Sequence, residues 1–271
     1  MIGLLKADFY RVRKSKLTLV ILILCVAFPL FITLMYLGIN ALTGDALGDE
    51  TLFSANTLMD SAFSLTNNIG LVIPAFAGIL VCSDISNGTL RNKVISGNRR
   101  VQIYLSHLIV SIVFCVFMIL LYTAATTGFA LLFFPFESDP SKDMTKQILY
   151  WAVNGVMTFV YIATVSTFLA MALRNVAPTI IFTLVLSLAL TAVSSVVSFL
   201  DTEKFKYLVY LIPTYSSSSF GLSSLNLMAL LGGGPTVPID TVFLLGLLSF
   251  VIFGVLNTVL GIVFFCRKDI K

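Results

Sequence analysis

The sequence predicts an all-α membrane protein with six transmembrane helices. Of its 271 residues, 58% are hydrophobic and 11% are charged, whereas soluble domains carry about 25% charged residues. Folded in water, such a chain would expose more apolar surface than soluble monomers tolerate. Its apolar runs are long enough to cross a bilayer, and its Lys and Arg residues gather in alternate connecting segments. We expect one transmembrane domain over residues 1–271, with both termini in the cytoplasm.

Residues 1–16 form a short basic segment before the first apolar run. Its apolar residues can share one face of a helix: Ile2, Leu4, Leu5, Phe9 and Val12. We expect an interfacial helix on the inner membrane surface, and a basic flank without this structure is the alternative. We do not expect a cleavable signal peptide, because the apolar run 17–39 is too long and no A-x-A site follows it.

Residues 17–39 are the first expected span, which Pro29 should kink. An acidic outer loop without Lys or Arg follows over residues 40–60. The second span covers residues 62–82, where Gly70, Pro74 and Gly78 recur at steps of four. Small residues at this spacing favour close helix packing, and a bend that moves during function is the alternative.

Residues 84–100 form the long polar loop with the most concentrated positive charge. Four basic residues stand against Asp84 alone: Arg91, Lys93, Arg99 and Arg100. A short basic loop of this kind fixes the orientation of the spans around it on the cytoplasmic side. The loop is also amphipathic, because Ile85, Leu90, Val94 and Ile95 can share one side. It must therefore bury that side against a partner or lie on anionic lipid.

The remaining spans are expected over residues 102–134, 148–173, 178–200 and 241–265. The segment 201–240 between the last two is only moderately polar, and its apolar runs are too short to cross a bilayer. We expect it to form short re-entrant or interfacial helices on the outer face. With this topology the inner segments hold 13 of the 17 Lys and Arg residues and three of the 13 acidic residues. A count of five or seven spans would break this asymmetry.

The span 178–200 carries small hydroxyl residues at helical spacing, namely Thr179, Thr183, Ser187, Thr191, Ser194 and Ser198. They predict either a hydrogen-bonded contact between helices or one wall of a pathway for an amphipathic substrate. The candidate pathway residues are Thr66 and Asn67 on the second span together with Thr183, Ser187, Thr191 and Ser194.

Several kinds of chemistry are missing. No charged residue lies in the middle of a span, which argues against an ion-coupled carrier. The P-loop motif GxxxxGK[ST] and the hydrolase motif GxSxG are absent, so we expect no ATPase site and no catalytic residue. We interpret the single histidine, His107, as an interfacial polar residue, and we expect no metal site and no nucleic-acid binding. The four cysteines lie in or beside apolar runs and predict no disulfide.

The loop 84–100 has the form D-x-x-x-G-T-L-R-x-K-x-x-x-G-x-R-R. With the basic amphipathic N-terminal segment and the short outer helices before the last span, it resembles the membrane subunit of type 2 ATP-binding-cassette (ABC) exporters. The likeness is greatest to small six-helix bacterial permeases for peptide export or self-protection, such as lantibiotic-immunity permeases and the phenol-soluble-modulin exporter. The sequence differs from the family pattern at Asp84, where Glu is usual, and at Asn98, where Pro is frequent.

This resemblance implies that the loop forms a coupling helix that docks on a separate cytoplasmic ABC ATPase subunit. The positions matching the motif are Asp84, Ile85, Gly88, Thr89, Leu90, Arg91 and Lys93. The partner ATPase would bind ATP and Mg, this chain would carry no cofactor, and the second and fifth spans would line the pathway. Two permease copies would pair, as a homodimer in membrane lipid.

We therefore expect a permease in the bacterial cell membrane that exports an amphipathic peptide or hydrophobic substrate, driven by ATP hydrolysed on the separate subunit. The alternative from another class is a non-transport immunity or sensory protein that binds a peptide at its outer face. Co-purification of an ATPase subunit distinguishes the two.

Overall fold

The computed structural model describes residues 2–43, 54–63, 68–136, 144–199, 209–213 and 239–267. All regular structure in these ranges is helical. Within these described ranges, four helices are long and apolar enough to cross a membrane, over Lys16–Ala41, Arg100–Phe133, Thr145–Leu173 and Asp240–Arg267. The protein is therefore all-α, as the composition predicts.

The chain opens with two helices that meet at a sharp bend. Helix α1 covers Ile2–Lys14 and α2 covers Lys16–Thr43. The Thr18 hydroxyl donates a hydrogen bond to the Val12 carbonyl across the bend, at 2.6 Å. Pro29 lies inside α2, where the Thr33 hydroxyl donates to the Pro29 carbonyl at 2.8 Å.

A helix that the sequence analysis did not expect follows within the acidic loop. Helix α3 covers Ala55–Ala62 and packs on α6 through Ala55, Leu58, Met59 and Ala62, which are all buried. This spacing is that of an amphipathic helix, and charge alone had marked the segment as a loop. As a result, the next apolar helix, α4, covers Asn68–Ser86 and starts later than the predicted span at Ala62.

Helix α5 is short, Thr89–Ile95, and leads into α6, which covers Arg100–Phe133. Helices α7 (Met144–Leu173) and α8 (Val176–Phe199) are joined at Arg174, whose φ of 58° is left-handed. This confirms the tight turn expected at Arg174 and Asn175. A short 3-10 turn, η4 (Val209–Leu211), precedes α11, Ile239–Arg267. The re-entrant helices expected over residues 201–240 fall almost entirely outside the described residues.

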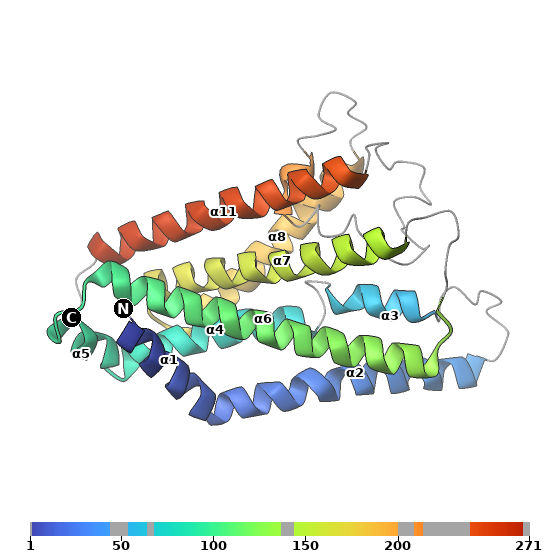
Figure 1. The fold of residues 1–271 in the computed structure, drawn as a ribbon, viewed down its shortest axis with the longest axis horizontal. Helices are drawn as coiled ribbons and strands as arrows, with labels where there is room; N and C mark the ends of the chain where they lie inside the picture. The colour runs from blue at the N-terminus through green and yellow to red at the C-terminus, as the bar shows by residue number, and fades with distance from the viewer. Residues whose placement is uncertain are drawn as a thin grey trace.

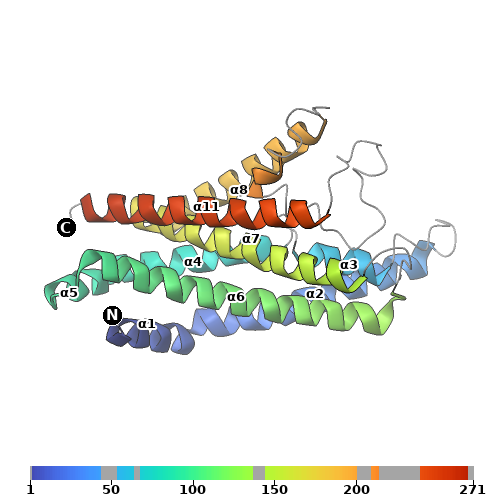
Figure 2. The same cartoon turned by 45° about the horizontal axis from the view of Figure 1, so that its top comes forward.

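The long helices stack in layers across the bundle, with α2 on one side, α6, α4 and α7 between, and α11 on the other (Figure 1). Helix α6 is central, because it contacts α1, α2, α3, α4, α5, α7 and α11. Helix α8 packs on α4 and α7 and then diverges from the bundle along its length (Figure 2). The start of α6, the end of α11 and the short helices α1 and α5 share one end of the molecule (Figure 1).

Candidate functional site

The site lies at this end of the molecule and begins with a stripe on α1. Leu4, Asp8 and Val12 recur every four residues, so they share one face of the helix, and all three are buried. This face packs on α6, whereas Ile2, which the sequence placed on the same apolar face, is exposed. An acidic residue thus occupies the middle of an apolar stripe.

The loop between α4 and α5 brings a second acid to the same place. Asp84 lies in the last turn of α4 and is fully buried. Gly88 has a φ of 68°, a left-handed conformation that glycine adopts without the steric cost of a side chain, and it starts α5. The Thr89 hydroxyl donates a hydrogen bond to the Asp84 carbonyl at 3.0 Å, which closes the turn.

Lys93 of α5 connects these acids to α6. Its Nζ lies 2.6 Å from Asp8 Oδ1, 3.0 Å from Asp84 Oδ2 and 3.3 Å from His107 Nε2. An ammonium group has three hydrogens to donate, so it can bond both carboxylates and also His107 in the tautomer whose Nε2 carries no hydrogen. Lys93 therefore joins α1, α4, α5 and α6 through one side chain.

The two remaining carboxylate oxygens also have partners. The Arg11 guanidinium forms an ion pair with Asp84 Oδ1, and the Ser106 hydroxyl donates to Asp8 Oδ2 at 2.8 Å. Two acids thus face two bases, and the formal charges cancel if His107 is neutral. We call these six residues the charge cluster, namely Asp8, Arg11, Asp84, Lys93, Ser106 and His107.

The surroundings shift the pKa values of the cluster residues on α1 and α5. Burial raises the pKa of the Asp8 carboxyl. The interactions with His107, Lys93 and Ser106 lower it by more than burial raises it, so the pKa lies below its ordinary value. Burial lowers the pKa of Lys93, against the opposing attraction of Asp8. Burial likewise lowers the pKa of Arg11. Because the cluster is largely buried, the charged form of each residue is stabilised by its oppositely charged partner.

The charge cluster also contains three groups of the kind that bind metals. The ligand atoms of Asp8, Asp84 and His107 lie within 4.8 Å of one another. The Lys93 ammonium lies within hydrogen-bond distance of all three groups, so a positive charge of the chain itself already occupies the place between these potential ligands. The geometry therefore offers no reason to place a metal there.

The other residues of the predicted coupling loop divide into a buried and an exposed set. Leu90 is buried against its own chain, and Ile85 and Val94 are partly buried. By contrast, Arg91 and Asn92 are exposed, and Ile95 is 73% exposed. The structure thus separates residues that hold α5 in place from residues that α5 presents outward.

The predicted pathway residues are only partly described. Thr183 of α8 is buried and its hydroxyl donates to the Thr179 carbonyl at 2.7 Å, while Ser187 donates to Leu184 at 2.9 Å. Thr66 and Asn67 lie outside the described residues, as do the side chains of Thr191 and Ser194.

Helices α4 and α8 approach each other closely at Gly78. A Cβ at this position would lie 3.1 Å from the Thr179 methyl group. Cys82 Sγ lies 3.7 Å from the Thr179 hydroxyl, one turn further along α4. At Gly78, therefore, the small residue serves packing, the first of the two interpretations of the spaced glycines.

Sequence reasoning missed most of the charge cluster. It placed Asp84 and Lys93 in the loop, but it did not connect them to Asp8, Arg11 or Ser106. The interpretation of His107 as an interfacial polar residue did not include the full burial of its side chain among the charged groups of the cluster. One signal was available for Asp8, since an acid between Leu4 and Val12 interrupts an otherwise apolar stripe.

Comparison with known families places this geometry in context. A search of curated proteins finds no match to the sequence. The family model described as ABC-2 family transporter protein matches residues 4–190. The matched region contains the whole charge cluster and runs from α1 into α8, more than half of the chain. The chain therefore belongs to the ABC-2 family of transporter proteins.

Proposed function

We propose that the chain is the membrane-spanning permease subunit of an ATP-driven exporter. It crosses the bacterial cell membrane six times, with both termini in the cytoplasm, and works as a homodimer with a separate ATPase subunit that binds ATP and Mg. Membership of the ABC-2 family and the long apolar helices support this proposal. Its substrate is an amphipathic peptide or another hydrophobic molecule, which moves outward along α4 and α8.

One observation carries the proposal furthest, namely the way α5 is held. A helix of seven residues has little stability of its own. Here Lys93 anchors it to three other helices, and Leu90 is buried beneath it. Meanwhile Arg91, Asn92 and Ile95 remain exposed on its outer side. A short, firmly anchored helix with an exposed basic and apolar side is suited to dock on a partner protein and to transmit that partner's movement.

The charge cluster also supports a way to transmit the movement of α5 to the other helices. A displacement of α5 acts through Lys93 on Asp84 of α4, on Asp8 of α1 and on His107 of α6. Helix α4 in turn packs closely on α8 at Gly78. Movement of the docked ATPase would thereby reach both helices proposed to line the pathway.

The proposal is tested by changing the exposed side of α5 alone. We expect the double variant Arg91→Ala and Ile95→Ala to lower permease-stimulated ATPase activity at least about tenfold, since truncating an interface anchor costs more than about 1 kcal/mol. Its thermal unfolding should match that of the unchanged protein. Leu90 is not suitable for this test, because its burial makes it a stability position.

The matched control is Arg13→Ala, which removes an equally exposed basic residue from α1. It should leave stimulation unchanged. If no ATPase subunit co-purifies, or if the α5 double variant stimulates normally, the coupling proposal is wrong. Absence of an ATPase would instead favour a peptide-binding protein without transport.

A further inference from the structure

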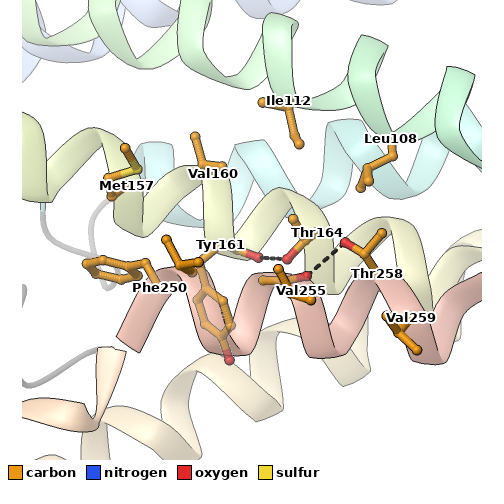
Figure 3. A pocket seen from close by; sticks show the side chains of 12 residues that line it. Leu108, Ile112, Met157, Val160, Tyr161, Thr164, Phe250, Val255, Thr258 and Val259 are labelled. Atoms are coloured by element: carbon orange, nitrogen blue, oxygen red, sulfur yellow. Dashed lines mark hydrogen bonds between the residues drawn. The ribbon is translucent and has the colours of Figure 1, made fainter. Parts of the chain in front are cut away.

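A groove lies on the surface of the bundle between α6, α7 and α11. It encloses about 340 Å³. Its walls are formed by Leu108 and Ile112 of α6, Met157 and Val160 of α7, and Gly254 and Val255 of α11 (Figure 3). All three helices are candidate membrane spans, so the groove opens at membrane depth.

The polar groups in the groove already have partners. The Thr164 hydroxyl donates to the Tyr161 carbonyl at 2.7 Å, and the Thr258 hydroxyl donates to the Gly254 carbonyl at 2.8 Å (Figure 3). The Tyr161 hydroxyl is hydrogen-bonded to Asn257. What the groove presents to a ligand is therefore hydrocarbon.

On the α11 side, the groove is bordered by exposed apolar side chains. Val251, Val255 and Val259 recur every four residues and are all more than half exposed. A Cβ on Gly254 would meet no atom within 4 Å, so the glycine leaves a gap in this wall.

An apolar chain gains little by leaving lipid for an apolar groove, because both surroundings are hydrocarbon. Selective binding must therefore come from a polar headgroup at the end of the chain. Three basic residues gather at the corresponding end of the same helices: Arg99 and Arg100 at the start of α6 and Arg267 at the end of α11. The Arg100 guanidinium donates to the Cys266 carbonyl at 2.9 Å, which holds these two helix ends together. Arg99 and Arg267 are exposed.

The spacing between this basic corner and the groove fits one lipid. At 1.5 Å per residue, Val259 lies about 12 Å along α11 from Arg267, and Leu108 lies about 12 Å along α6 from Arg100. The far end of the groove, at Phe250, lies about 25 Å from Arg267 on the same scale. Half of a bilayer with its headgroups measures about 20 Å. A headgroup at the arginines would therefore place the distal part of its acyl chain in the nearer part of the groove, between Val259 and Gly254, which lies about 20 Å from Arg267 on the same scale.

We propose that this surface binds an anionic phospholipid, with its phosphate at Arg99, Arg100 and Arg267 and one acyl chain in the groove beside Gly254. The site is separate from the charge cluster and from the exposed side of α5. It does not depend on which substrate the protein exports.

The test uses native mass spectrometry of the full purified chain from mixed micelles of detergent with phosphatidylglycerol or phosphatidylcholine. The protein should retain phosphatidylglycerol in preference to phosphatidylcholine. Arg267→Gln should lower phosphatidylglycerol retention about fivefold, which is the usual contribution of one basic residue near an anionic surface. Gly254→Leu, whose Cβ meets no atom within 4 Å and whose side chain extends into the groove, should lower retention of the lipid to a similar degree.

Each variant has a matched control. Gly128→Leu places the same side chain in open space on α6, and Arg13→Gln removes an exposed arginine from α1. Both controls should retain lipid as the unchanged protein does. Equal retention in all variants would overturn the proposal, as would equal retention of the two lipids. A change of oligomeric state in Gly254→Leu alone would also overturn it, because the occupant would then be a second copy of the chain.

Discussion

Lys93 occupies a position where removal of one side chain leaves two carboxylates short of a partner. Replacing a buried set of paired charges by apolar residues can be neutral, because burying the charges is costly to begin with. Removing a single member is different, since the remaining charges stay buried without compensation. In the charge cluster, Asp84 would then keep its ion pair with Arg11, while Asp8 would keep only the hydrogen bond from the uncharged Ser106 hydroxyl among the contacts described above.

We therefore predict that Lys93→Met lowers the free energy of unfolding by about 3–5 kcal/mol, the usual cost of breaking a buried ion pair. The methionine keeps the unbranched shape of the side chain and most of its length but supplies no donor. The measurement is thermal or denaturant unfolding of the purified protein. Arg91→Met, on the exposed side of the same helix, is the control and should leave the unfolding midpoint nearly unchanged. Equal stability of the two variants would show that the cluster does not hold the fold.

Gly261 allows an unusually close approach between α11 and α6. A Cβ on this residue would overlap the Tyr104 hydroxyl, and Tyr104 itself is fully buried. We predict that Gly261→Ala lowers stability by about 1–3 kcal/mol, the usual cost of overpacking. Tyr104→Leu in the same chain should recover part of the loss, because the two positions are in contact. Gly254→Ala on the same helix meets open space and should cost little by comparison.

Among the helices, α1 and α5 stabilise each other, although 74 residues of sequence lie between the end of α1 and the start of α5. Each is short, and their main connection in the described structure runs through Asp8 and Lys93. Short helices of this kind draw their stability from tertiary contacts rather than from helix propensity. The loss of that connection should consequently loosen both helices together.

We predict that Asp8→Asn increases amide hydrogen exchange in α1 and also in α5, while exchange in α11 stays the same. The amide keeps the shape of the side chain but removes the charge that holds Lys93. Lys6→Gln, which alters an exposed residue on α1, should change neither helix. Faster exchange confined to α1 would mean that the cluster does not link the two helices.

The whole molecule has two chemically different ends. One end carries α1, α5, the start of α6 and the end of α11, with most of the described basic residues. The other end carries α3 and the start of α11, where the Tyr150 hydroxyl donates to Asp240 at 2.7 Å. From the positive-inside rule, we predict that the first of these ends faces the cytoplasm.

Cysteine labelling tests this orientation. We predict that Arg91→Cys reacts with a membrane-impermeant maleimide in inverted vesicles but not in intact cells, and that Phe136→Cys shows the opposite pattern. Both changes are made with Cys266→Ser, because the other three native cysteines are buried. Reaction of both positions from the same side would contradict the proposed topology.

Much of this architecture follows from residues read one segment at a time. The helix ends at Arg174 and Asn175 and the close packing at Gly78 were expected from local pattern, and so was a helix that contains Pro29. Helix α3 was missed because its acidic surroundings outweighed the apolar spacing of Leu58, Met59 and Ala62. The burial of His107 beside Lys93 was not predicted, because the sequence around a lone histidine near a helix end does not show which distant residues surround it.

By itself, the sequence determined the class of protein and the polarity of its ends, because hydropathy and charge act on each segment independently of the others. Only the tertiary structure decided that Asp8, Asp84, Lys93 and His107 meet in one buried cluster, and that Leu90 faces inward while Ile95 faces outward. Such contacts join residues up to about a hundred positions apart, and their partners are set by how helices pack around α6, which no local pattern encodes.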